Sequence, residues 1–516
     1  MFTPPDSHCV KTEERKEFAA THGLVGGLRR LGPGWLMALV ILTVVVGFGH
    51  AAESRPNILI ILADDMGYGD LGCYGGRAIT PNIDRLAAEG IKFEECYSGA
   101  PNCSPARVSL MTGRIPTRAG MYSYRPDGST MHLRGEEITM AEVLQGAGYQ
   151  TAHVGKWHLS CLPQDPALNQ AQPIDQGFEY SLGTENNAEP SHLNPVNYVR
   201  NGVEIGEQKG YSCQLLADEV ETWFATVYEE EKPFLLYVAF HEPHAKIATP
   251  PELVAQYPDL DQDSAEYFGN IQHMDSAVGR VLAALEAQGV ADNTMIFFGS
   301  DNGSYRLGSN GNLRGLKGGV YDGGIKVPGI FHFPKKFKGN RISNTPMWFP
   351  DLLPTISALT GAKVPDGLAL DGIDLGPLLE GRPAPWREQP LMWYFYRSSP
   401  EASMRYGDYS LVARSSDDQP RTHPLVAEDM PFVKTVKPEF FELYDLAKDP
   451  GQRNDLAASM PGKLADMKAR FWVLFEESRA EGPDWIGLPR ANTFKATHHK
   501  PAEFITNQKQ FLNPEG

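Results

Sequence analysis

Cysteine and basic charge are both scarce in this sequence. The 516 residues contain only 6 cysteines, with no CxxC pair and no zinc-binding spacing. Lys and Arg number 47 against 64 Asp and Glu, which gives a net charge of −17 and a pI of about 5.3. Such an acidic chain lacks the general attraction to phosphates on which nucleic-acid binding depends. We therefore expect no nucleic-acid partner, and any anionic substrate needs a local basic pocket.

Only one segment, near the N-terminus, has a membrane-like composition. Arg29 and Arg30 precede an apolar run at residues 35–46, and mostly small residues follow at 49–52. This order is typical of a signal peptide, and the run is short for a membrane span. We expect residues 1–52 to be an N-terminal extension with a signal peptide and the protein to be exported, to a periplasm or outside the cell. An uncleaved signal anchor is the alternative, and no stable membrane partner is predicted.

Export would leave an odd number of cysteines. Cleavage would remove Cys9, and the remaining ones are Cys73, Cys96, Cys103, Cys161 and Cys213. An unpaired thiol is unusual in an oxidising compartment, so we expect one of these five cysteines to have a specific role.

The larger part of the chain, from Pro56 to about Gly372, alternates short β-rich apolar runs with helical patterns. This alternation predicts an α/β fold with a large, mostly parallel sheet between helices. A turn-rich stretch around residues 365–385 suggests a boundary between a domain at 53–375 and one at 376–516.

The predicted second domain has fewer elements. A candidate strand lies at residues 409–413 and a helix near 463–479. We expect a smaller α+β domain there.

Four apolar runs end in residues that can bind a metal or transfer a proton. The runs and the polar residues after them are 57–62 with Asp64 and Asp65, 150–155 with Lys156 and His158, 234–240 with His241 and His244, and 294–299 with Asp301 and Asn302. Ligands of open α/β sheets bind beyond the carboxyl ends of the strands. Because four runs share this property, they predict a common site.

Cys103 lies in a segment that favours an oxyanion site. Pro105 fits the first turn of a helix, which places Cys103 at the helix N-terminus, where free amides attract anions. Arg107, four residues on from Cys103, can return its guanidinium to the same face. The alternative is a buried structural cysteine.

The run CSPAR at residues 103–107, followed by LMTGR at 110–114, resembles the maturation signature of the formylglycine-dependent type I sulfatases, which are arylsulfatase-like members of the alkaline phosphatase superfamily. The resemblance extends from Pro56 to roughly Ala457. It implies that a maturation enzyme oxidises Cys103 to formylglycine, whose aldehyde hydrate is the nucleophile. The other four exported cysteines are then structural or paired.

Two further motifs resemble the metal-binding motifs of this family. They are Asp64-Asp65 and the run SDNG, which contains Asp301 and Asn302. The resemblance implies that these residues, with the modified Cys103, bind Ca²⁺, and Mg²⁺ is the alternative. Three carboxylates and an amide suit the several oxygen ligands that calcium needs. Either motif alone could be an Asx turn.

Two basic segments also match the family. By the resemblance, Lys156 and Lys317 bind the sulfate, and His158 holds the formylglycine hydroxyl. Arg107 would stabilise the charge on the sulfate oxygens. Arg314, three residues before Lys317, is expected to order its loop.

His241 and His244 both follow the third run. Family members place a catalytic histidine six residues before a proline that starts a helix, and this spacing selects His244 through Pro250. The family usually has a proline where this chain has Lys246, so His241 stays as the second choice. The chosen histidine would bind substrate and protonate the leaving alcohol, with Lys317 as the alternative acid.

The resemblance implies a sulfuric ester hydrolase that acts on a sulfated carbohydrate and also accepts aryl sulfates. A phosphonate monoester or phosphodiester hydrolase is the nearest alternative, because relatives with that activity share the CxPxR signature. A non-catalytic binding protein on a decayed scaffold is a further alternative, although the intact set of motif residues argues against it. Substrate specificity is expected in loops such as residues 184–197 and in the second domain.

Overall fold

The structure, a computed structural model, describes residues 55–305, 307–396, 401–416, 425 and 427–485. The predicted signal peptide and Cys9 lie outside these residues. Within them, no helix has both the length and the apolar character required to cross a membrane.

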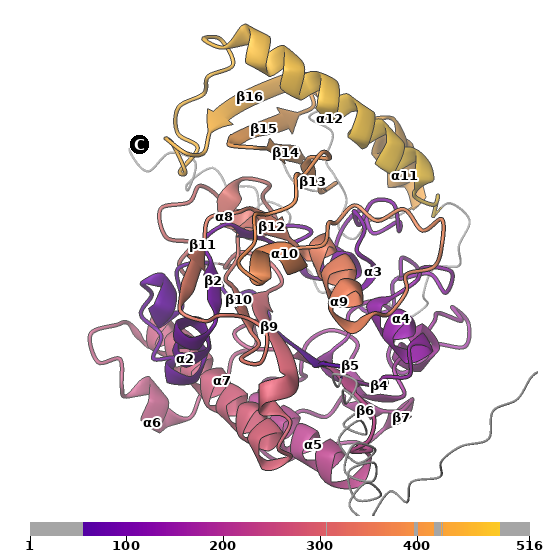
Figure 1. Ribbon diagram of the computed structural model, residues 1–516, viewed down its shortest axis with the longest axis vertical. Helices are drawn as coiled ribbons and strands as arrows, with labels where there is room; N and C mark the ends of the chain where they lie inside the picture. Colours follow the sequence, from indigo (N-terminus) through magenta and orange to yellow (C-terminus); the bar gives the residue numbers. More distant parts are fainter. Residues whose placement is uncertain (1–54, 306, 397–400, 417–424, 426, 486–516) are drawn as a thin grey trace, which may run out of the picture. The chain divides into compact units, whose positions relative to one another are not determined.

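A ten-stranded mixed sheet forms the centre of the fold, with the strand order β11-β2-β10-β9-β1-β8-β4-β5-β6-β7 (Figure 1). Its central strands are β9 (Thr294–Ser300), β1 (Asn57–Ala63), β8 (Phe234–Ala239) and β4 (Gln150–Lys156). Each pairs in parallel with its neighbour among the four. These are the four apolar runs singled out in the sequence, and the mostly parallel sheet is confirmed.

Shorter strands extend the sheet on both sides. They are β2 (Ile91–Phe93), β5 (Tyr180–Thr184), β6 (Val199–Arg200), β7 (Val203–Glu204), β10 (Gly329–His332) and β11 (Arg341–Ser343). β10 runs antiparallel to both of its neighbours. A separate pair joins β3 (Cys96–Tyr97) to β12 (Met347–Trp348) in parallel.

Both faces of the central sheet are buried. Every residue of β1 is buried, with Ile58 and Ile60 in one apolar core and Leu59 and Ile61 in the other. Alternate residues of a strand point to opposite faces, so a strand that is covered twice is a continuous apolar run. The run NILIIL is therefore apolar throughout because both of its faces are covered by an apolar core.

Two layers of helices provide these cores (Figure 1). One layer contains α2 (Pro81–Glu89), α5 (Ser212–Thr226) and α7 (Gln262–Ala287), and the other contains α3 (Cys103–Thr112), α4 (Met140–Gly146) and α9 (Leu352–Thr360). α7 buries Met274, Val278 and Leu282, which helical spacing places on one face. Short helices are α6 (Pro251–Val254), α8 (Asp322–Ile325), α10 (Gly376–Leu379) and α11 (Met430–Thr435).

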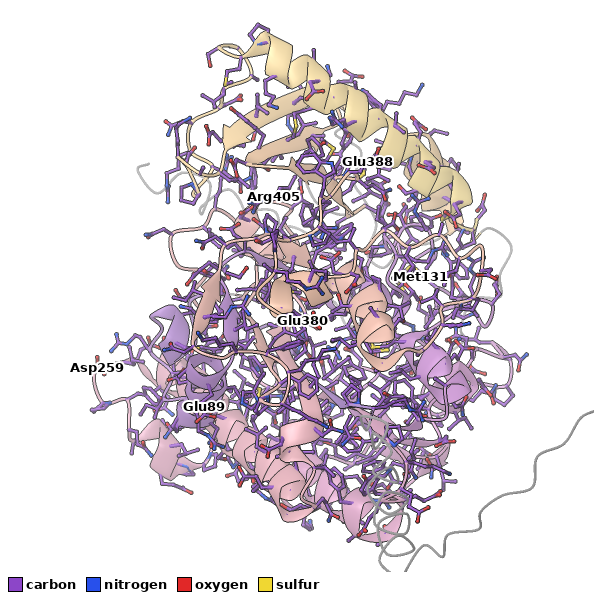
Figure 2. All side chains as sticks on the ribbon, in the orientation of Figure 1. Glu89, Met131, Asp259, Glu380, Glu388 and Arg405 are labelled. Atoms are coloured by element: carbon purple, nitrogen blue, oxygen red, sulfur yellow. The ribbon has the colours of Figure 1, made fainter. Side chains whose placement is uncertain are left out.

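The smaller α+β part contains a four-stranded antiparallel sheet and one long helix. The strands are β13 (Leu391–Tyr394), β14 (Ala402–Tyr406), β15 (Tyr409–Arg414) and β16 (Phe440–Asp445), and the helix is α12 (Pro461–Glu481). Arg405 on β14, which is labelled in Figure 2, forms hydrogen bonds with Glu95 and Tyr97 of the larger part. The α+β content is confirmed, and the boundary at residue 375 stays a prediction.

The five cysteines at positions 73, 96, 103, 161 and 213 are all free thiols. None of the described residues forms a disulfide, so the four cysteines other than Cys103 are structural rather than paired in this structure.

Candidate active site

The ends of the four central strands meet at one edge of the sheet. Their register pairs Ala63 with Ser300, Leu62 with Ala239, and Gly155 with Ala239. Parallel strands place their carboxyl ends on the same edge. The polar residues that follow each strand are consequently brought together, as the sequence predicted.

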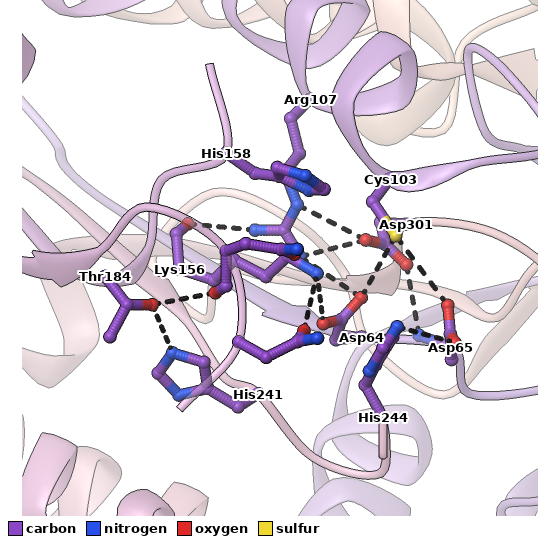
Figure 3. Close-up of polar contacts among 12 residues, drawn as sticks. Asp64, Asp65, Cys103, Arg107, Lys156, His158, Thr184, His241, His244 and Asp301 are labelled. Atoms are coloured by element: carbon purple, nitrogen blue, oxygen red, sulfur yellow. Dashed lines mark hydrogen bonds and ion pairs between the residues drawn. The ribbon is translucent and has the colours of Figure 1, made fainter. Parts of the chain in front are cut away.

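The first turn of α3 brings Cys103 to this edge. Asn102 is the N-cap, and its side chain accepts a hydrogen bond from the Cys103 amide at 3.0 Å. The Cys103 thiol lies 3.5 Å from Asp64 Oδ1 and 3.9 Å from Asp65 Oδ1 (Figure 3). Burial raises the pKa of this thiol above its usual value. An unmodified Cys103 is therefore protonated and a poor nucleophile.

Three carboxylates crowd around this thiol. Ligand atoms of Asp64, Asp65, Cys103 and Asp301 all lie within 4.8 Å of one another, and all four residues are buried. Burial and the repulsion of Asp64 raise the pKa of Asp301 to about 7. Like charges this close are stable only beside compensating positive charge.

The donor set fits a hard divalent cation. Asn302 donates its Nδ2 hydrogens to Asp65 Oδ1 and to its neighbour's carbonyl, which leaves its buried Oδ1 without a hydrogen-bond partner. That amide oxygen and the three carboxylates are the ligand types of Ca²⁺ and Mg²⁺. The predicted ligands Asp64, Asp65, Cys103, Asp301 and Asn302 are thus gathered at one point.

Two lysines lie against the same carboxylates. Lys156 Nζ is 2.6 Å from Asp64 Oδ2, and Lys317 Nζ is 2.6 Å from Asp65 Oδ1. Burial alone would raise the pKa of Asp64, but Lys156, His244 and Arg107 hold it well below its usual value. Burial lowers the pKa of Lys317, but the nearby Asp65 outweighs it and keeps that pKa above its usual value. Lys317 is therefore positively charged beside the cluster.

Arg107 is buried and supports the site through hydrogen bonds. Its Nη2 donates to Asp301 Oδ2 at 2.9 Å, and its Nη1 donates to the Lys156 carbonyl at 3.0 Å and to Tyr237 Oη at 3.3 Å. Its guanidinium lies beside Asp301 in the site, and its bonds to that carboxylate orient Asp301 (Figure 3).

His158 presents one free ring nitrogen. Its backbone is left-handed, with a φ of 59°, and its Nε2–H donates to the Arg125 carbonyl at 2.7 Å. Its buried Nδ1 has no hydrogen-bond partner. Burial, with the nearby Lys156, holds its pKa well below the usual value, so the ring is neutral and Nδ1 can accept a proton or a hydrogen bond.

His244 turns its Nε2 toward the cluster, whereas the free nitrogen of His158 is Nδ1. Its Nδ1–H donates to the Ala245 carbonyl at 2.6 Å, and its Nε2 lies 3.4 Å from Asp65 Oδ2. Burial lowers the pKa of His244, and Asp65 opposes this shift. The ring is partly exposed, with 21% of its side chain accessible, so a ligand can approach it.

His241 is enclosed in a chain of hydrogen bonds. Thr184 donates its only hydroxyl hydrogen to the Asn186 carbonyl at 2.7 Å, so it accepts from His241 Nε2–H at 2.8 Å. Ser212 then donates to His241 Nδ1 at 2.8 Å. Burial lowers the pKa of His241 well below its usual value. Both ring nitrogens are occupied, and no proton is available for transfer.

The sequence motifs did not identify Asn187 or Arg125. Asn187 Oδ1 accepts from Lys156 Nζ at 3.3 Å, and the Arg125 carbonyl orients His158. Asn187 lies within residues 184–197, the loop expected to govern specificity. Arg314 lies apart from the cluster and donates to Tyr444 Oη at 2.9 Å, in keeping with a role in ordering its loop.

A sequence model of the Sulfatase family matches residues 56–362. The chain belongs to the sulfatase family. Human (Homo sapiens) arylsulfatase A is 32% identical to it over 472 residues, which cover 83% of this chain and 88% of that protein. The N-acetylgalactosamine-6-sulfatase of Canis lupus familiaris is 31% identical over 411 residues, covering 73% of this chain and 75% of that protein. This sulfatase is accordingly a sulfuric ester hydrolase.

Solved structures agree with this assignment. The crystal structure of Ps i-CgsB in complex with k-i-k-neocarrahexaose superposes with a TM-score of 0.72 at 26% identity, and the match covers 90% of this chain and 98% of that one. The sulfatase fold, with its large sheet and smaller antiparallel sheet, is thereby shown.

Proposed function

We propose that this sulfatase removes sulfate from a sulfated carbohydrate and also accepts aryl sulfates, with a nucleophile made from Cys103 by oxidation to formylglycine. The observation that carries the proposal is the position of Cys103, at the N-terminus of α3 and within 3.5 Å of Asp64. A hydrated aldehyde there supplies one hydroxyl for attack on sulfur and a second whose deprotonation expels the sulfate. The thiol itself, whose pKa is raised by burial, is unsuited to either task.

Asp64, Asp65, Asp301 and Asn302 would hold a calcium ion, with residue 103 beside them and Mg²⁺ as the alternative. Such an ion supplies positive charge that lowers the pKa of a bound hydroxyl. It would also balance the carboxylates that Lys156 and Lys317 now neutralise. Both lysine ammonium groups would then be able to bind sulfate oxygens.

The remaining steps use side chains that the structure describes. Lys156 and Lys317 stabilise the charge on the sulfate oxygens, and the positive charge of Arg107 supports them. His158 accepts a proton at Nδ1, its free nitrogen. His244 delivers a proton from Nε2 to the departing alcohol when the ring is the imidazolium ion, the form that the neighbouring Asp65 favours.

Two relatives support a carbohydrate substrate. One is an N-acetylgalactosamine-6-sulfatase, and the structure of another contains k-i-k-neocarrahexaose. We further propose that the chain is exported through its N-terminal signal peptide and matured by a formylglycine-generating enzyme. A phosphonate or phosphodiester hydrolase is not favoured by these relatives.

A side-by-side assay tests the proposal. Matured protein is given the nitrophenyl esters of sulfate, phosphate and phenylphosphonate, together with a panel of sulfated mono- and oligosaccharides. Sulfate esters should be hydrolysed with the highest kcat/KM, and Cys103→Ala should abolish the reaction while the fold is retained. Preferential hydrolysis of the phosphonate would contradict the proposal.

A further inference from the structure

A buried polar cluster lies behind His244 and has no role in the chemistry described above. It consists of His192 in the loop before α5, Glu242 after β8, and Asn270 on α7. Their exposures are 1%, 0% and 1%, respectively. We call these three residues the His192 clamp. Burying polar side chains this deeply costs free energy unless they are paired, so we expect this cluster to have a role.

Glu242 anchors the clamp. Its Oε1 accepts from the Cys213 amide at 2.9 Å, and its Oε2 accepts from the His241 amide at 3.1 Å. His192 Nδ1 lies 3.8 Å from Oε1. Within the described part of the chain no lysine or arginine forms an ion pair with this carboxylate, and His192 is its one partner able to carry a positive charge.

The other members have unused hydrogen-bonding capacity. Both ring nitrogens of His192 and the Oδ1 of Asn270 are buried without a hydrogen-bond partner. Burial lowers the pKa of His192, while the side chains of Glu242 and Asn270 oppose that shift. The ring therefore lies beside two groups that can accept a hydrogen bond, the Glu242 carboxylate and the Asn270 side chain.

The clamp is connected to His244 through the backbone. The His192 amide donates to the Lys246 carbonyl at 3.1 Å, and Asn270 Nδ2 donates to the Ala248 carbonyl at 3.2 Å. These bonds fix the segment that begins with Ala245, whose carbonyl accepts from His244 Nδ1 at 2.6 Å. The orientation of the His244 ring depends on this carbonyl.

We propose that His192 is a positioning residue for His244. Its ring lies against Glu242 and fixes residue 192, whose backbone amide binds the Lys246 carbonyl, while Asn270 binds the Ala248 carbonyl of the same segment. This inference rests on the proposed role of His244 as the acid. Substitution of His192 keeps its backbone amide but removes the ring that rests on Glu242. Residue 192 and the bound segment should then shift and let the His244 ring turn, so that proton delivery suffers while the sulfate-binding groups stay in place.

The experiment compares a nitrophenyl sulfate, which needs little acid catalysis, with a sugar sulfate that has a poor leaving group. His192→Ala should lower kcat for the sugar sulfate by about 10-fold or more, part of the roughly 10²–10⁴-fold that a general acid contributes, and leave nitrophenyl sulfate within about twofold. In a His244→Ala background, His192→Ala should add no further leaving-group-dependent loss. His192→Gln, which keeps a polar side chain of similar length, should show a weaker form of the same pattern.

His273→Ala is the matched control, because His273 is a half-buried histidine on α7 whose ring packs on Tyr211. It should affect both substrates equally. An equal loss on both substrates in His192→Ala and His192→Gln, or a loss that adds to that of His244→Ala, would overturn the role of His192. An unmutated protein that hydrolyses no sulfate ester would instead contradict the proposed function.

Discussion

His244 and His241 are three residues apart, yet their imidazole rings have opposite surroundings. His244 keeps Nε2 toward Asp65 and the site, whereas His241 uses both nitrogens on Thr184 and Ser212. A general acid needs a proton within reach of the leaving group. This difference favours His244, the choice that the spacing to Pro250 also suggested.

Leaving-group dependence distinguishes these two histidines. His244→Ala should slow sulfate esters of poor leaving groups about 10²–10⁴-fold and nitrophenyl sulfate far less. His241→Ala should cause a smaller loss that is equal for all substrates, because this ring only supports the site. Steady-state kinetics with a series of aryl and alkyl sulfates measures both effects. The assignment is wrong if His241→Ala shows the dependence and His244→Ala does not.

The elements that form the site were largely predictable, whereas some of the contacts between them were not. Four apolar runs followed by polar residues identified β1, β4, β8 and β9, because strands covered on both faces are continuous apolar segments. Their adjacency in the order β9-β1-β8-β4 depends on long-range pairing that no local pattern records. Asn187 and His192 were also missed, because single polar residues in a loop resemble ordinary surface positions.

The proposed metal site depends on two of these elements, because its carboxylates follow β1 and β9. A chelator should abolish activity and lower the Tm, since the buried Asp64, Asp65 and Asp301 would lose their shared counter-ion. Asp301→Ala should abolish activity in the same way. Elemental analysis and thermal unfolding measure the two effects.

Asp259→Ala is the control for this experiment, because that carboxylate is exposed and pairs with Arg77 at the surface. It should keep both metal content and activity. Full activity with no bound metal in the chelated protein would show that the ligand assignment is incorrect.

Polar contacts join the four-stranded sheet to the larger part of the molecule, next to β3. Trp393 Nε1 donates to the Ser98 carbonyl at 2.7 Å, and Arg405 pairs with Glu95, which also binds Lys326 at 2.7 Å. Groups that are satisfied only across such a boundary become unpaired when either side unfolds. We therefore expect the described residues to unfold as one cooperative unit.

Arg405→Ala should lower the free energy of unfolding by about 2–3 kcal/mol, less than the ~3–5 for a fully buried pair, because Glu95 is partly exposed and keeps Lys326. Arg382→Ala, at an exposed ion pair with Glu380, should cost no more than about 1 kcal/mol. Urea unfolding followed by fluorescence and circular dichroism measures both values. Two separated transitions in the unmutated protein would contradict the expected cooperativity.

The nucleophile is the central claim about the whole enzyme, and peptide mass spectrometry tests it most directly. The tryptic peptide that contains Cys103 should be lighter in active protein by the loss of H₂S and the gain of one oxygen, which converts the thiol to an aldehyde. Preparations with different degrees of conversion should show sulfate ester turnover in proportion to the converted fraction. Fully active protein in which Cys103 is an unmodified cysteine would contradict the account.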